Sequence, residues 1–226
     1  MLYNKTMKAL LTSTGICTTE LAQALSRLVG KPLDQINIAV INEASAVEPG
    51  DKRWSFDEMY NLSRVVGGEI DVINLLALDL KTIEQRMDFA DVIYVVGGLS
   101  DYLMAVFERT GFSELLRDKL LNEKVYVGAS AGSMVLGRRI TTEGYRQVYR
   151  KGEQDFGVNE YLALVDFSIF PHLDSPEFIR NRIEIIDNAT IDFGYPVYAI
   201  QDTQAVVVNG DEASFIGGDV AKFGNK

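Results

Sequence analysis

The chain has 226 residues, of which 47% are hydrophobic, and its net charge is −10 from 22 basic and 32 acidic residues. That length and hydrophobic share suit one α/β domain with a packed core, and they argue against disorder. The acidic balance excludes nucleic acid and anionic membrane surfaces as general partners.

The first part of the chain alternates short apolar runs with segments of helical spacing. Strands are predicted at residues 8–12, 36–41, 69–76, 91–98 and 124–129, and helices at 18–29, 55–66, from 82, from 100, and 113–121. The strands are continuous apolar runs, which is typical of a parallel sheet with helices on both faces. No linker or repeat divides the chain, so we expect a single domain over residues 1–226.

The loops at one edge of this sheet should carry the functional groups. Right-handed crossovers bring the C-terminal ends of parallel strands to the same edge, and ligands bind outside those ends. Thr12-Ser13, Gly97-Gly98 and Ser130 all lie at the C-terminal ends of predicted strands. We expect the loop at 42–54, with Pro49-Gly50-Asp51, to lie at the surface.

The segment from Arg138 to Glu160 is polar and carries four arginines and one lysine. It can be a solvated surface excursion, or it can cover a substrate or bind an anionic group. Both interpretations stay open at this stage.

The last part of the chain predicts one further helix and several short strands. A strand at 167–170 runs into Pro171-His172, and a helix over 175–189 is indicated by Ser175-Pro176 and an apolar stripe. Three short strands follow at 197–200, 205–208 and 213–216, with a tight hairpin at Asn209-Gly210-Asp211.

The sequence Gly-Ala-Ser-Ala-Gly at 128–132 is the clearest motif. A strand that reverses sharply into a helix needs nearly side-chain-free positions two before and two after the apex, and Gly128 and Gly132 occupy them. Such a turn holds the Ser130 hydroxyl out from the sheet edge. Gly-x-Ser-x-Gly also occurs by chance, so its surroundings decide its meaning.

A serine becomes a nucleophile only when a base takes its proton. The one histidine, His172, follows a predicted strand and can serve as that base. A carboxylate must orient it, and the candidates are Asp202, which we favour because it follows a strand, and Glu143 in the polar excursion. The backbone N–H groups of Ala131 and Gly98 can bind the oxyanion.

These residues resemble the peptidase E family of serine peptidases, which includes α-aspartyl dipeptidase and cyanophycinase. The resemblance rests on residues 94–98 (Tyr-Val-Val-Gly-Gly), the elbow at 128–132, Phe170-Pro171-His172 and, more weakly, residues 200–207. It implies a flavodoxin-like sheet related to the class I glutamine amidotransferases. It also implies Ser130 as nucleophile, His172 as base, Gly98 and Ala131 as oxyanion donors, and a carboxylate at Asp202 or, alternatively, Glu143.

The resemblance supports the chemistry more than the specificity. Aspartyl dipeptidases have an asparagine after the oxyanion glycine, where this chain has Leu99. They also have an arginine after the histidine, which aligns with Ile179; Arg180 lies next to it and is the candidate substrate-binding residue.

We therefore expect a serine peptidase that acts on small peptides, such as dipeptides with N-terminal Asp or related isopeptides, through an acyl-enzyme. An esterase or amidase with the same triad, and an inactive binding module on the same scaffold, remain alternatives. The single Cys17 favours a reducing compartment. The sequence contains no Cys-x-x-Cys pair of the kind that binds zinc, and we expect no metal and no other cofactor. Without a signal peptide or an apolar run near 20 residues, the chain is expected to be soluble and cytoplasmic. A homodimer is a possible assembly, although the sequence does not give the oligomeric state.

Overall fold

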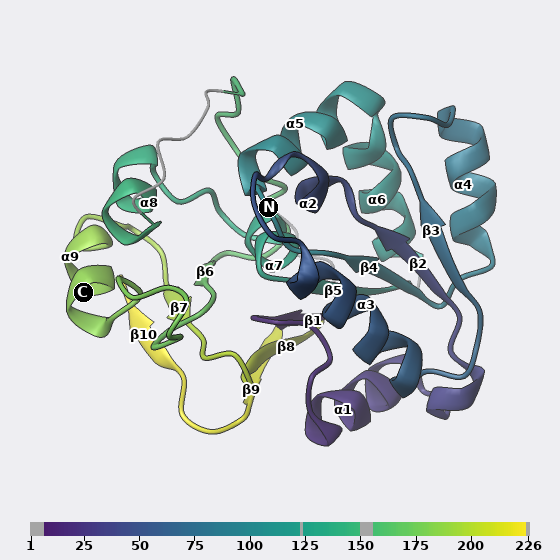
Figure 1. Ribbon diagram of the computed structural model, residues 1–226, viewed down its shortest axis with the longest axis horizontal. Helices are drawn as coiled ribbons and strands as arrows, with labels where there is room; N and C mark the ends of the chain where they lie inside the picture. Colours follow the sequence, from purple (N-terminus) through teal and green to yellow (C-terminus); the bar gives the residue numbers. More distant parts are fainter. Residues whose placement is uncertain (1–6, 123, 150–155, 225–226) are drawn as a thin grey trace.

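The computed structural model describes residues 7–122, 124–149 and 156–224, which fold around a seven-stranded sheet with the order β3-β2-β4-β5-β1-β8-β9 (Figure 1). Its strands are β1 Lys8–Thr12, β2 Ile38–Ile41, β3 Ile70–Ile73, β4 Val92–Val95, β5 Val125–Ala129, β8 Ala205–Asn209 and β9 Glu212–Ile216. The first five pair in parallel, and β8 and β9 are antiparallel. The predicted mostly parallel α/β sheet is confirmed.

Helices cover both faces of this sheet. They are α1 Thr19–Val29, α2 Glu43–Val47, α3 Arg53–Val65, α4 Leu80–Asp88, α5 Ser100–Thr110, α6 Phe112–Leu121 and α7 Ala131–Leu136, with a 3-10 turn at Leu33–Gln35. The side chains of β1 alternate between two cores, because successive residues of a strand point to opposite faces. Leu10 packs with α1 and α3, whereas Ala9 and Leu11 pack with α4 to α7.

A second, smaller sheet lies beside the first and contains β6 Ser168–Phe170, β7 Val197–Ala199 and β10 Ala221–Phe223, in the order β10-β7-β6 (Figure 1). The strands β6 and β7 are parallel, with Phe170 opposite Ala199. The sequence did not predict β10. Because β6 and β7 end side by side, the residues that follow them, His172 and Asp202, come into contact.

The predicted helix over 175–189 is wrong in its first half. The helix α9 spans only Ile183–Ala189, and residues 175–182 form bends and turns. Tertiary contacts hold this segment against the loop after β6: the Phe178 ring stacks on His172, and the buried Asn181 side chain donates to the Pro171 carbonyl at 2.6 Å. The expected apolar stripe is buried only in part, since Ile186 is buried and Phe178 half-buried whereas Ile179 and Ile183 face solvent.

Two expected loops contain helices. The segment 42–54 holds α2 and the start of α3, and the polar excursion holds α8 Thr142–Tyr149; residues 150–155 of that excursion lie outside the described part of the chain. None of the helices in the described ranges combines the length and apolar character needed to cross a membrane.

Candidate active site

Ser130 lies at the apex of the turn between β5 and α7, with a φ of 49° in the left-handed region that side chains disfavour. The backbone can only make this turn because its glycines lack side chains. A Cβ on Gly128 would lie 2.6 Å from the Gly132 carbonyl carbon, and one on Gly132 would lie 2.1 Å from the Val95 oxygen. The Ser130 N–H donates to the Thr12 carbonyl at 3.1 Å, which ties the elbow to β1.

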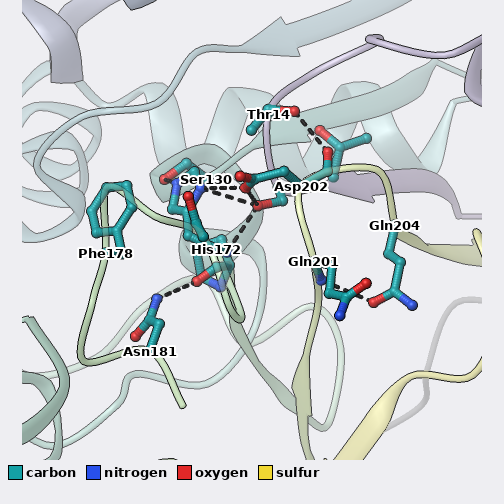
Figure 2. A network of polar contacts seen from close by, with 12 residues as sticks. Thr14, Ser130, His172, Phe178, Asn181, Gln201, Asp202 and Gln204 are labelled. Carbon is teal, nitrogen blue, oxygen red and sulfur yellow. Dashed lines mark hydrogen bonds and ion pairs between the residues drawn. The ribbon is translucent and has the colours of Figure 1, made fainter.

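His172 follows β6 and reaches the serine. Its Nε2 lies 3.0 Å from the Ser130 Oγ (Figure 2). The residue is 9% exposed, and the Phe178 ring stacks on the imidazole at 4.2 Å between centroids. A φ of 66° turns the backbone here, and the Leu173 N–H donates to the Ile200 carbonyl at 2.9 Å. The imidazole is therefore positioned by the Phe178 ring on its face and by the backbone hydrogen bond of the next residue, Leu173.

Asp202 follows β7 and contacts the other ring nitrogen. Its Oδ1 lies 2.8 Å from the His172 Nδ1. Burial alone would raise the pKa of Asp202, but hydrogen bonds and charge attraction from His172, together with the Ser13 hydroxyl, lower it. The ionised carboxylate can only accept, so Nδ1 carries the proton and Nε2 is free to accept the Ser130 proton.

The turn that presents Asp202 is held on both sides (Figure 2). The Thr14 hydroxyl donates to the Asp202 carbonyl at 2.7 Å. The Gln204 side chain accepts from the Gln201 N–H at 2.9 Å and donates to the carbonyls of Gly217 and Asp219. These contacts fix the carboxylate relative to β1 and the main sheet.

Ser13 completes this cluster, and the sequence assigned it no role. Its Oγ donates to the Asp202 Oδ1 at 2.9 Å, accepts from the His172 backbone N–H at 2.8 Å and lies 3.2 Å from Nδ1. The hydroxyl thus bridges the base and its carboxylate. Its position just after β1, next to β5, was the available signal, but the sequence does not reveal that its side chain faces His172 and Asp202.

The predicted oxyanion donors flank Ser130. Ala131 is the first residue of α7, so its N–H has no partner within that helix. Gly98 follows β4 with a φ of 135°, and a Cβ there would lie 2.2 Å from the Ala44 carbonyl of α2. A Cβ on the neighbouring Gly97 would lie 3.1 Å from the Ser130 Cβ, so the Gly97-Gly98 loop after β4 runs beside the serine.

The remaining predicted site residues lie in different places. A cavity opens beside Ser130, and Arg180 is one of the residues that line it. The Arg180 Nε donates to the Gln147 carbonyl at 2.8 Å. Leu99 lies outside that cavity, at the N-cap of α5, where its N–H donates to the Ala44 carbonyl. Glu143 is exposed on α8 and accepts from Gln147, so Asp202 rather than Glu143 contacts His172.

The cavity has a volume of about 660 Å³ and opens over Ser130, His172 and Asp202. One wall comes from α3 and the loop before it, and the other from α8 and residues 175–180. Within the first wall, Glu58 is buried and accepts from the Tyr94 hydroxyl at 2.9 Å; burial raises its pKa to about 7. In the described ranges, no group of three or more His, Cys, Asp or Glu side chains could hold a metal ion.

Comparisons with known proteins point to peptidases of the same fold. A family model described as peptidase family S51 matches residues 9–216. An uncharacterized peptidase of Pasteurella multocida, PM1590, is 30% identical over 177 residues, which cover 77% of this chain and 82% of that protein. Peptidase E of Streptomyces coelicolor is 30% identical over 139 residues, covering 59% and 55% of the two chains. A crystal structure from Listeria monocytogenes EGD-e, provisionally assigned to peptidase E, superposes with a TM-score of 0.74 at 22% identity, over 94% of this chain and 99% of that one, which supports the fold.

Proposed function

Because this chain belongs to peptidase family S51 and is a serine-type peptidase, we propose that it hydrolyses small peptides through an acyl-enzyme formed on Ser130. The observation that carries this proposal is the chain of contacts from Ser130 through His172 to Asp202. The distances are 3.0 Å from Oγ to Nε2 and 2.8 Å from Nδ1 to Oδ1. Both lie within the range required for proton transfer and for orientation of the base.

Each residue has a role in the proposed reaction. His172 Nε2 accepts the Ser130 proton while Oγ attacks the scissile carbonyl, and Asp202 stabilises the imidazolium that forms. The N–H groups of Gly98 and Ala131 bind the oxyanion of the tetrahedral intermediate. His172 then gives its proton to the leaving amine. Water then attacks the acyl carbonyl while His172 takes one of its protons, and the new tetrahedral intermediate collapses as the bond to the Ser130 Oγ breaks. His172 returns the proton to that Oγ, so the carboxylic acid product leaves and the enzyme is restored.

The proposed substrates are small peptides because the active-site cavity is small. A volume of about 660 Å³ falls within the range of ordinary small-molecule pockets. Phe178 and Tyr149 on one side and Trp54 on the other limit it, which suits a dipeptide or a short peptide better than a folded protein.

A serine-directed phosphonate probe combined with a dipeptide library tests the proposal. We expect the probe to label Ser130, and we expect Ser130→Ala to lose labelling and at least about 10³-fold in kcat/KM. Ser63→Ala is the matched control, because Ser63 is an exposed serine of α3 that bonds only locally.

Peptide turnover that survives in Ser130→Ala would refute the acyl-enzyme. Turnover of simple acyl esters with no hydrolysis of any peptide would favour the esterase alternative instead.

A further inference from the structure

The wall of the active-site cavity formed by α3 is acidic. Trp54, Asp57, Glu58 and Asn61 line the cavity at helical spacings of three, four and seven residues, so they share one face of α3. Two more carboxylates, Glu48 and Asp51, line the cavity from the preceding loop.

The charges around this wall cancel only in part. The Lys52 Nζ lies 3.8 Å from Glu48, and Arg53 pairs with Asp51, so two carboxylates have cationic neighbours that themselves lie outside the cavity lining. Asp57 is exposed on the cavity face of α3.

The opposite wall does not supply an excess of positive charge. It carries Glu177 and Arg180, and the Arg180 Nε is held by the Gln147 carbonyl. With Asp202, six carboxyl groups and one guanidinium line the cavity in the described part of the chain. Burial raises the pKa of Glu58 to about 7, so this group carries only part of a charge near neutral pH, and Asp202 is paired with His172.

The acidic wall lies next to the reacting atoms. A Cβ on Gly97 would meet the Ser130 Cβ at 3.1 Å and the Trp54 ring carbon Cζ3 at 3.6 Å. The indole therefore lies against the Gly97-Gly98 loop that runs beside the nucleophile. The Lys52 Nζ already lies 5.5 Å from the centroid of this ring and 3.8 Å from Glu48, so the exposed Asp57 is the main group of this wall that can attract a substrate cation.

We propose that this site prefers peptides that carry a cationic side chain, such as lysine or arginine, in a residue next to the scissile bond. The inference rests on the proposed peptidase function and specifies its substrate class. An aspartyl side chain placed there would face Asp57 and Glu48 and be repelled, whereas an ammonium or guanidinium group would be attracted.

The test compares Lys-Ala and Ala-Lys with Nle-Ala and Ala-Nle, in which norleucine keeps the length of lysine without its charge, and with Asp-Ala. The two lysine peptides distinguish the acyl side from the leaving side of the bond. We expect one lysine peptide to exceed its norleucine partner by about tenfold in kcat/KM, and the advantage to shrink as salt screens it.

Charge variants locate the preference. We expect the ratio of kcat/KM for the lysine and norleucine peptides to fall about threefold in Asp57→Asn and about tenfold in Asp57→Lys. Asp192→Asn and Asp192→Lys are matched controls, because Asp192 is an exposed aspartate outside the cavity lining. They produce the same change in net charge and should leave the ratio unchanged.

The outcomes separate this inference from the function on which it rests. If peptides are cleaved but Asp-Ala or a norleucine peptide is preferred, or if the Asp57 and Asp192 series shift the ratio equally, the charge preference is overturned and the peptidase stands. If no peptide is cleaved and the probe does not label Ser130, the proposed function and this inference fail together.

Discussion

Ser13→Ala removes one hydroxyl that three atoms around the base share. The Oγ accepts from the His172 N–H at 2.8 Å, donates to the Asp202 Oδ1 at 2.9 Å and lies 3.2 Å from the His172 Nδ1. Alanine leaves the backbone N–H of His172, a buried residue, without this acceptor and takes one donor from Asp202. Both the orientation of the imidazole and the stability of the fold should suffer.

The contacts set the size of the effect. An unsatisfied buried N–H costs about 1–3 kcal/mol, and the lost bond to the half-buried carboxylate adds about 1 kcal/mol, so unfolding should become about 2–4 kcal/mol easier. For a chain of 226 residues that is a fall in Tm of roughly 5–12 °C. A small displacement of the imidazole should lower kcat about 10- to 100-fold with little change in KM.

The assay pairs steady-state kinetics on a responsive peptide with thermal unfolding. Ser13→Thr keeps the hydroxyl and should restore most of kcat. Ser168→Ala is the matched control, because Ser168 is a buried serine whose Oγ donates to the Arg138 carbonyl at 2.6 Å. It should lose stability and keep kcat.

Two results would refute this reasoning. One is a Ser13→Ala enzyme with wild-type kcat. The other is an equal loss of kcat in Ser13→Ala and Ser168→Ala, which would mean that lost stability, rather than the position of the base, limits turnover.

Two further predictions concern carboxyl groups near the site. Asp202→Asn should lower kcat about 10³- to 10⁴-fold, because an amide does not keep the proton of His172 on Nδ1. Glu143→Gln should keep kcat within about twofold of the wild-type value, and a larger loss would make Glu143 the orienting acid. For Glu58, burial raises the pKa from 4.5 to about 7, so the unfolded chain releases this proton first and folding weakens as pH rises between those values. Glu58→Gln should therefore flatten that slope and raise the free energy of unfolding at pH 8 by about 3 kcal/mol, measured by urea unfolding at pH 5 and pH 8; an unchanged slope would contradict the assignment.

Local patterns in the sequence were sufficient to predict the central sheet and its nucleophile turn. The helix α1 has its N-cap at Thr18, whose side chain accepts from the Leu21 N–H, and the hairpin at 209–211 joins β8 and β9. Such features depend on hydrogen bonds and spacings within a few residues. The same is true of Gly128 in the elbow, where a Cβ would meet Gly132 and Ser133 of the same turn, whereas Gly132 is required by its contact with Val95 of the neighbouring strand β4.

The helix predicted over 175–182 failed for the opposite reason. Ser175-Pro176 is a good local start for a helix, but the segment forms turns in which Phe178 stacks on His172 and Asn181 donates to the Pro171 carbonyl. These contacts outweigh a local preference that is weak in a short segment. The ring that results lies directly against the imidazole.

The sequence by itself determined that a serine, a histidine and a carboxylate follow strands, because apolar runs and glycine turns are readable one segment at a time. Only the tertiary structure decided which groups meet. Asp202 rather than Glu143 contacts His172 because β6 and β7 pair side by side, and Ser13 joins them because β1 pairs with β8, with Thr12 opposite Ala205. Strand order is set by long-range packing of whole faces, and no local pattern encodes it.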